Sequence, residues 1–117
     1  MRSERIKWKK KCIELAKKIV RSKGICEWCG KTSKESQLHG SHIYSVRNES
    51  TCAMVENILC LCAYCHLHKW HEQPVEAWDW FDKKFPDRRK KLRRLSDSVV
   101  KYGVSDWKRI YEELKSL

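Results

Sequence analysis

The amino-acid sequence predicts one α+β domain, in which a cysteine-rich centre lies between an N-terminal helix and a helical C-terminal third. Three observations support this prediction. Apolar residues recur at helical spacing at both ends of the chain, short β-branched stretches lie in the middle, and two Cys-x2-Cys pairs enclose that middle. A chain of 117 residues has the length of one small domain rather than two.

A basic helix is expected within residues 1–23. Its apolar residues follow one another at spacings of three and four, the pattern of a single buried face: Trp8, Cys12, Leu15 and Ile19. Ten lysine and arginine residues lie between Arg2 and Lys23, mostly off this face. Gly24 is expected to end the helix.

Residues 24–73 are expected to form the α+β core. The stretches "LHGSHIYS" and "ENILCL" are typical of short strands, and the polar stretch "RNEST" between them is typical of a loop. A helix is expected to begin within "CAYCHLHKWH", which places two cysteines and three histidines on or near its first turns.

Residues 74–117 are expected to form the helical tail. Pro74 suits the first turn of one helix, whose apolar face would include Val75. A second helical stripe is expected to extend as far as the Gly103 break: Leu92, Leu95, Val99 and Tyr102. Ser105 is expected to cap a last helix.

The composition points to a polyanionic partner. Charged residues make up 35% of the chain and the net charge is +11, which is typical of proteins that bind nucleic acid. No apolar run reaches the length needed to cross a bilayer, and the basic start is not followed by an apolar signal region. We therefore expect a protein of the reducing cytoplasm, where seven cysteines favour metal binding over disulfides.

The two Cys-x2-Cys pairs predict a structural zinc site formed by Cys26, Cys29, Cys62 and Cys65. Two intervening residues let both sulfurs of a pair reach one tetrahedral ion, with a tight turn after the first pair. Four thiolates close the coordination shell and leave no open position for chemistry. Cys60 is an alternative zinc ligand to Cys62. The cysteines outside the predicted site are otherwise expected to be small core residues: Cys12, Cys52 and Cys60.

Two histidines are placed where chemistry could follow. His66 comes directly after Cys65, so a bound zinc would hold its backbone and prepare a second ligand site. His42 is expected at a strand end, where a histidine of near-neutral pKa could act as a base.

Together these motifs resemble a known family. Cys-x2-Cys, then "SHI", then Asn57, then "LCAYCH" is similar to the HNH endonucleases of the ββα-metal (His-Me finger) fold. The string "NILCLCAYCHLHKWHEQPVEAWDWF" resembles the small phage HNH proteins grouped with the recombination protein NinG. The resemblance covers residues 24–85 and implies that chain 1–117 is a single HNH nuclease domain with a zinc-stapled ββα-metal core.

The resemblance also implies residue roles. His42 would be the general base that activates water, and Asn57 would fix the loop and help to orient His42. His66 would bind a catalytic divalent ion, Mg²⁺ or Mn²⁺, at which a DNA phosphodiester bond is hydrolysed. The family usually has Asp or His before the base, whereas this chain has Ser41, whose hydroxyl is a poor ligand.

Other assignments stay open at this point. His39 and His71 are possible extra ligands of the catalytic ion, although His71 could instead pack beside Trp70, and His68 is expected to be solvated. DNA phosphates are expected to contact a run of cations in "DRRKKLRRL": Arg88, Arg89, Lys90, Lys91, Arg93 and Arg94.

Two further functions remain possible for such a chain. The first is a zinc-binding, DNA-binding module without catalytic activity, which the serine at position 41 favours. The second is an accessory factor of a phage recombination or packaging complex.

Overall fold

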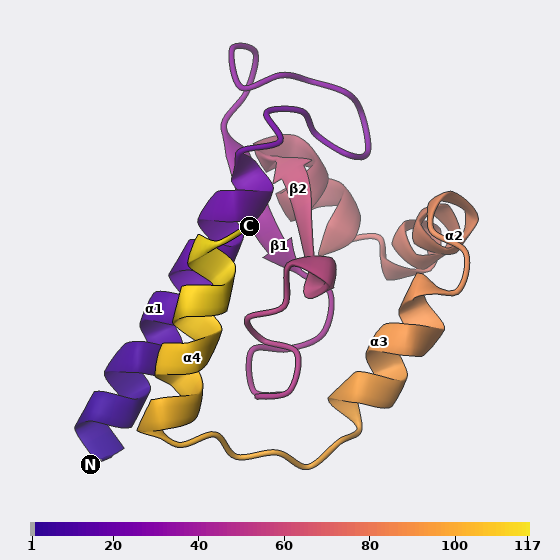
Figure 1. The fold of residues 1–117 in the computed structure, drawn as a ribbon. Helices are drawn as coiled ribbons and strands as arrows, with labels where there is room; N and C mark the ends of the chain where they lie inside the picture. Colours follow the sequence, from indigo (N-terminus) through magenta and orange to yellow (C-terminus); the bar gives the residue numbers. More distant parts are fainter. Residues whose placement is uncertain (1) are drawn as a thin grey trace.

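The structure is a computed structural model that describes residues 2–117. It consists of a two-stranded antiparallel sheet with helices on both sides, which confirms the predicted α+β class (Figure 1). The elements follow the chain in this order: α1 (Arg2–Arg21), β1 (Leu38–His42), the 3₁₀ turn η1 (Val55–Asn57), β2 (Ile58–Cys62), the π-helix η2 (Cys65–Trp70), α2 (Pro74–Lys84), α3 (Arg88–Ser96) and α4 (Val104–Lys115).

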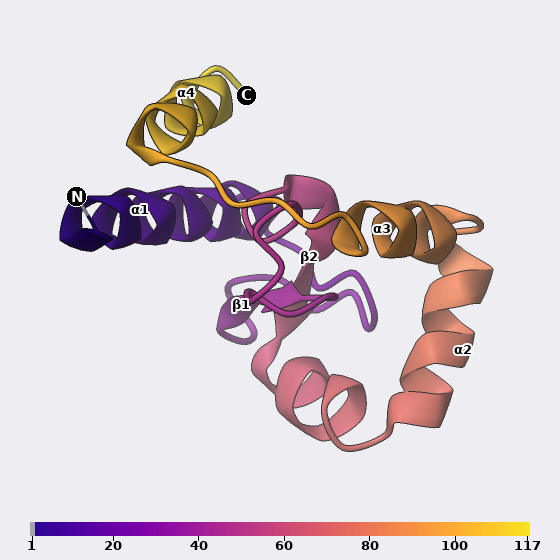
Figure 2. The same cartoon turned by 90° about the horizontal axis from the view of Figure 1, so that it is seen from below.

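The sheet is the centre of the molecule. Strand β1 pairs with β2 so that Leu38 lies opposite Cys62 and His42 opposite Ile58. Every residue of β2 is buried, because α1 covers one face of the sheet while η2 and α2 lie at the other (Figure 2). A strand covered on both sides needs apolar residues at successive positions, which the sequence "ILCLC" supplies.

Helix α1 forms as predicted and packs against β1 and α4. Cys12, Ala16 and Val20 are its buried residues. The Cys12 thiol donates a hydrogen bond to the Trp107 carbonyl at 3.1 Å, and Trp8 meets the ring of Tyr111 edge-to-face at 5.5 Å. The last helix thus contributes to the core beside the first one, and Trp107 is completely buried there.

The tail differs from the prediction at three points. Helix α3 ends at Ser96 rather than Tyr102, and Val99 is fully exposed, because residues 97–103 extend to carry the chain across to α4 (Figure 1). Tyr102 instead packs edge-to-face on Trp107 at 5.1 Å. Val75 is 77% exposed rather than part of a buried face.

The start of α4 also corrects the expected cap. The helix begins at Val104, so Ser105 lies within its first turn and Gly103 occupies the cap position. The Asp106 carboxylate accepts a hydrogen bond from the Gly103 N–H at 2.9 Å, which satisfies a donor that the helix itself leaves free. Among residues 2–117, no helix combines the length and apolar character needed to cross a membrane.

Candidate metal centre and histidine cluster

The four cysteine sulfurs form one cluster, as predicted. The Sγ atoms of Cys26, Cys29, Cys62 and Cys65 all lie within 4.8 Å of one another, and those of Cys29 and Cys62 are 3.6 Å apart. A tetrahedral zinc ion with bonds of about 2.3 Å requires sulfurs about 3.8 Å apart. The cluster therefore can hold a structural zinc ion.

Local backbone geometry prepares this site. Gly30 has φ of 81° and closes a turn through its hydrogen bond to the Cys26 carbonyl at 3.0 Å. Within each pair, the second cysteine's N–H donates to the first one's sulfur, at 3.5 Å for Cys29 and 3.4 Å for Cys65. Such donors stabilise the thiolate form that a metal binds.

The thiols differ in their readiness to ionise. Burial raises the pKa of Cys26, but backbone N–H donors more than offset this and lower it to about 7. Burial is also the largest influence on Cys29 and Cys65, and it raises both pKa values. Neighbouring thiolates repel one another, so a cation is needed before all four can be charged together.

The turn that carries the first pair docks directly onto β2. The Glu27 N–H donates to the Cys60 carbonyl at 2.8 Å, and the Glu27 carboxylate accepts from the Cys60 N–H at 2.7 Å. Cys60 thus contributes its backbone to this contact, while its side chain lies outside the sulfur cluster. The rivalry between Cys60 and Cys62 is resolved in favour of Cys62, and Cys12, Cys52 and Cys60 are all fully buried core residues.

Three histidines form a second cluster directly beside the first. The Nδ1 atoms of His39 and His66 are 2.8 Å apart, and the Nε2 atoms of His66 and His71 are 3.0 Å apart. Two nitrogens bound to one ion at about 2.1 Å lie about 3.0–3.4 Å apart. Because His66 uses a different nitrogen toward each neighbour, the geometry offers two chelating pairs, with His39 or with His71.

The π-helix explains why His66 and His71 meet. In η2 the His71 N–H donates to the His66 carbonyl, a bond over five residues rather than four. The wider turn places residues five apart on one face, and such turns are frequent at functional sites. The pKa of His66 is lowered to about 4 by burial, with smaller contributions from His71 and His39. The ring is therefore neutral near pH 7, the form that binds metals.

Ser41 lies on the same face of β1 as His39, because side chains alternate along a strand. It is 1% exposed, and its Oγ has no hydrogen-bond partner among residues 2–117. An unpaired buried hydroxyl costs free energy, so this oxygen has an unused capacity for a hydrogen bond. His68, in contrast, is exposed and faces Glu72 at 3.6 Å, as expected of a solvated histidine.

His42 lies at the end of β1, on the strand face opposite His39. Its Nε2 lies 2.8 Å from the Cys52 carbonyl, an acceptor, so Nε2 carries the proton and Nδ1 keeps a free lone pair. Burial is the main cause that lowers its pKa below the ordinary value of 6.5. His42 is therefore neutral near pH 7 and able to accept a proton.

Asn57 closes the loop that follows His42. It is fully buried, its Oδ1 accepts from the Tyr44 N–H at 2.8 Å, and its Nδ2 donates to the carbonyls of Tyr44 and Thr51 at 3.1 Å each. These partners lie 13 and 6 residues away, so the Asn57 side chain connects segments that are not adjacent in the sequence. The side chain ties both ends of the loop together.

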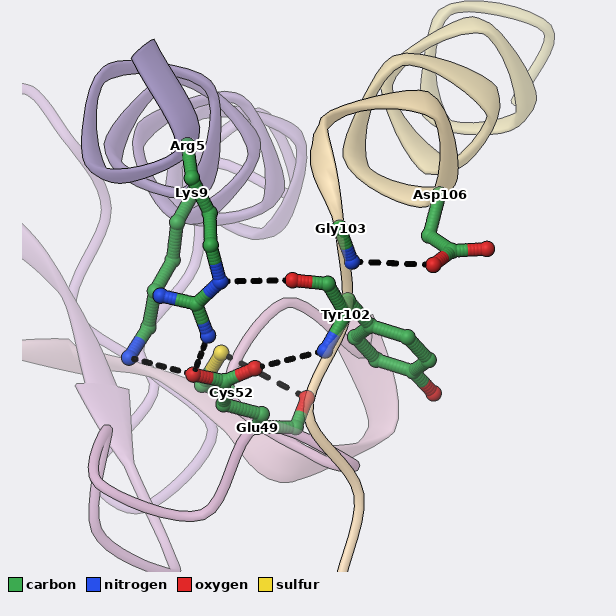
Figure 3. A network of polar contacts seen from close by, with 7 residues as sticks. All are labelled: Arg5, Lys9, Glu49, Cys52, Tyr102, Gly103 and Asp106. Atoms are coloured by element: carbon green, nitrogen blue, oxygen red, sulfur yellow. Dashed lines mark hydrogen bonds and ion pairs between the residues drawn. The ribbon is translucent and has the colours of Figure 1, made fainter. Parts of the chain in front are cut away.

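Glu49 anchors the same loop to distant parts of the chain (Figure 3). Its carboxylate pairs with Arg5, lies 3.8 Å from the Lys9 ammonium, and accepts from the Tyr102 N–H at 2.9 Å. The pKa of Glu49 is lowered because its hydrogen bonds to Arg5 and Tyr102 outweigh burial. The Glu49 carbonyl in turn accepts from the Cys52 thiol. This network holds the backbone whose carbonyl binds His42.

The cations of α3 are not equivalent. Arg88 is half-buried, donates twice to the Glu56 carbonyl, and covers Phe85 at 4.6 Å. Arg89 pairs with Asp82 at 3.1 Å. The other four are exposed: Lys90, Lys91, Arg93 and Arg94. DNA contact by this helix stays a prediction, and two of its six cations already have protein partners.

Sequence reasoning missed the supports of the histidines. Glu49 has no signature in the sequence, because its partners Arg5 and Tyr102 come from opposite ends of the chain. The Cys52 carbonyl has none because it acts through its backbone. Comparison of the chain with protein-family models, with curated proteins and with solved structures finds no match.

Proposed function

We propose that this protein is a metal-dependent HNH endonuclease that hydrolyses DNA phosphodiester bonds. The observation that carries the proposal is the state of His42, whose Nε2–H is held by the Cys52 carbonyl while Nδ1 remains free. The chain order supports a ββα-metal core, since two antiparallel strands lead into a helix that begins at Cys65 and carries His66.

His42 acts as the general base in this proposal. Its Nδ1 takes a proton from the attacking water, and the Cys52 carbonyl steadies the resulting imidazolium through Nε2–H. Asn57 and Glu49 keep Cys52 in place, so they act through the loop and touch no reacting atom. A neutral, oriented imidazole is what this step requires near neutral pH.

The catalytic ion would be held by His66, together with His39 or His71, and Ser41 offers a further oxygen. When bound, such an ion stabilises negative charge on the scissile phosphate and on the leaving oxygen. Imidazole nitrogens suit transition ions, whereas Mg²⁺ prefers carboxylate and water oxygens. Of the two candidate ions we favour Mn²⁺, because it accepts imidazole nitrogens more readily than Mg²⁺ does.

The sulfur cluster has a separate task. Its four thiolates would enclose a structural zinc ion completely. Cys65 is the first residue of η2, so zinc bound there would fix the start of the helix directly before His66. Zinc binding would thus position a ligand of the second ion without itself meeting the substrate.

A nicking assay tests the proposal. Supercoiled plasmid is incubated with zinc-loaded protein and Mn²⁺ or Mg²⁺, and wild type is compared with His42→Ala and with the exposed control His68→Ala. Removal of a general base is expected to lower the rate by about 10²–10⁴-fold, whereas the control keeps full activity. Equal rates in wild type and His42→Ala would reject the assigned base.

The same assay separates the alternatives. The neutral Ser41, at the position where the family usually carries a metal ligand, favours a zinc-binding module that binds DNA without cutting it. If wild type binds the plasmid DNA tightly but does not nick it with either Mn²⁺ or Mg²⁺, that result would support the binding module. Nicking that appears only with a phage recombination or packaging protein present would support the accessory role.

A further inference from the structure

Helix α1 crosses β1 at Gly40, which lies between His39 and His42 in the strand. A Cβ atom at Gly40 would lie 2.9 Å from the Lys17 Cβ and 3.1 Å from its Cα, so only glycine permits this close approach. The contact fixes the root of the Lys17 side chain beside the strand that carries His39 and His42. The contact thus sets the point from which the flexible Lys17 side chain extends its ammonium.

Two hollows in the surface meet at Lys17. One, of about 420 Å³, is lined by His42 together with α1 residues that include Lys9, Lys10 and Lys17. The other, of about 300 Å³, is lined by His39 and His66 and again by Lys17, with Arg21 beyond it. Lys17 is the residue common to both, so α1 borders the base on one side and the proposed metal ligands on the other.

The charges along this face of α1 are mainly positive and only partly compensated, since Glu49 pairs with Arg5 and Lys9 at the N-terminal end. Glu14 is the acidic residue in the lining of the larger hollow, and its carboxylate is 3.9 Å from the Lys17 ammonium. Lys10 and Arg21 make no ion pair among residues 2–117. An open, positively charged border of this kind attracts a phosphate chain.

We propose that Lys10, Lys17 and Arg21 hold the backbone of DNA against the histidines, with Lys17 contacting the phosphate that is cut. This inference rests on the proposed nuclease function and names the surface that receives its substrate. Lys10 and Arg21 are about 16 Å apart along the helix axis, which is the rise of about five nucleotides of one duplex strand. The row therefore covers about five phosphates in all, about three toward Lys10 and about two toward Arg21 from the cut.

Helix α3 does not share this relation to the histidines. In both views α1 extends to the left of the strands and α3 lies to their right (Figures 1 and 2). The first two cations of α3 are engaged with Glu56 and Asp82. Its exposed cations would add general attraction for DNA, but they line neither of the two hollows.

The test compares two faces of the same helix. Lys10→Gln/Lys17→Gln removes two charges from the proposed surface, and Lys7→Gln/Lys18→Gln removes two charges roughly 80° around the helix. Both are made in the His42→Ala background, and binding to a labelled DNA duplex is measured by fluorescence anisotropy over a salt series. We expect the first variant to bind at least tenfold more weakly, with a salt slope smaller by about two, because two phosphate contacts are lost.

The control variant is expected to lose less than threefold in affinity and to keep its salt slope. Equal losses in both variants, or a greater loss on replacing Lys90 and Arg94 of α3, would overturn the assignment of α1. Thermal melts of all variants check that the exposed substitutions leave the fold intact.

A cleavage experiment separates this inference from the function on which it rests. With His42 restored, Lys17→Gln is expected to lower the rate at saturating DNA by tenfold or more, and Lys17→Arg to recover most of it. If wild type never cuts DNA but needs Lys10 and Lys17 to bind it, the proposed nuclease activity is refuted and the proposed DNA-binding surface is supported. Full cleavage by Lys17→Gln would refute Lys17 as the phosphate contact while the nuclease stands.

Discussion

The sulfur cluster and the histidine cluster are joined by a single peptide bond, between Cys65 and His66, yet they are built in opposite ways. The four sulfurs lie within 4.8 Å of one another and form a closed set. The histidines meet only in pairs, and His71 at one end is exposed. A closed set of ligands stabilises a fold, whereas an incomplete set leaves positions where water and phosphate can bind.

The two sites also differ in what supports them. Each pair of cysteines is organised by its own short turn, through N–H donors three residues away. His42 depends on a loop that is held by Asn57 and by Glu49, with partners as distant as Arg5 and Tyr102. Each half of the structural site is therefore shaped by local sequence and is joined to the other half through β2, while the candidate catalytic site depends on contacts from both ends of the chain.

The comparison predicts its largest effect at Cys62. Cys62→Ser should remove a zinc ligand and most of the folding free energy, several kcal/mol or more, because structural zinc can contribute about 10–16 kcal/mol in small domains. Cys60→Ser makes the same atomic change two residues earlier in β2, at an equally buried side chain, and should cost only about 1–3 kcal/mol. Thermal unfolding with and without a chelator measures both.

His42→Ala provides the contrast from the other site. It should leave the melting temperature within a few degrees of wild type, because its ring contributes a single hydrogen bond of about 1 kcal/mol. Equal destabilisation by Cys62→Ser and His42→Ala would contradict the separation of a structural site from a catalytic one.

At Asn57 the expected loss of stability lies between those of Cys62→Ser and His42→Ala. Asn57→Ala leaves three backbone groups without their buried partner and should cost about 2–4 kcal/mol, measured by urea unfolding. Asn48→Ala, in the same loop, removes a partly exposed side chain and should cost less than about 1 kcal/mol. Similar costs for the two variants would show that the loop does not depend on Asn57.

Metal titration sharpens the comparison at the second site. Zinc-loaded protein is titrated with Mn²⁺ by calorimetry, and His66→Ala is expected to bind at least tenfold more weakly because His66 takes part in both candidate pairs. His68→Ala, two residues along η2, should bind like wild type. Unchanged Mn²⁺ binding in His66→Ala would place the second ion elsewhere.

The most subtle prediction concerns pH. Burial lowers the pKa of His42, so the neutral base persists below the ordinary value of 6.5. As pH falls, cleavage should stay constant through neutrality and decline only with a midpoint below 6.5, since protonated His42 accepts no further proton. A pH–rate profile on zinc-saturated protein measures this midpoint, and a value above 6.5 would mean that another group acts as the base.

These differences also explain what the sequence could predict. The four zinc cysteines followed from spacing alone, because a Cys-x2-Cys turn is complete within a few residues. Helix α1 followed from apolar periodicity, and the strands followed from short, partly β-branched stretches on either side of a polar loop. The prediction for the helical tail was wrong where apolar residues at helical spacing have no neighbouring element to pack against, as the exposed Val99 shows.

The candidate catalytic site was predictable only in its residue types. The resemblance named His42, Asn57 and His66, and their roles remain predictions. The meeting of His66 with His71 depends on a π-helical turn, for which the sequence has no established signal. The positions of Lys17 and Glu49 arise from contacts between segments far apart in the chain, which periodicity does not report.

The Glu49 contacts have a practical consequence for shortening the chain. The carboxylate joins the first turns of α1 to the segment just before α4, so each end of the molecule supports the loop behind His42. A truncated version lacking either end would strip Glu49 of a partner and leave its charge poorly neutralised. Expression trials that trim the termini to reach a minimal core would therefore discard the groups that keep the imidazole aligned.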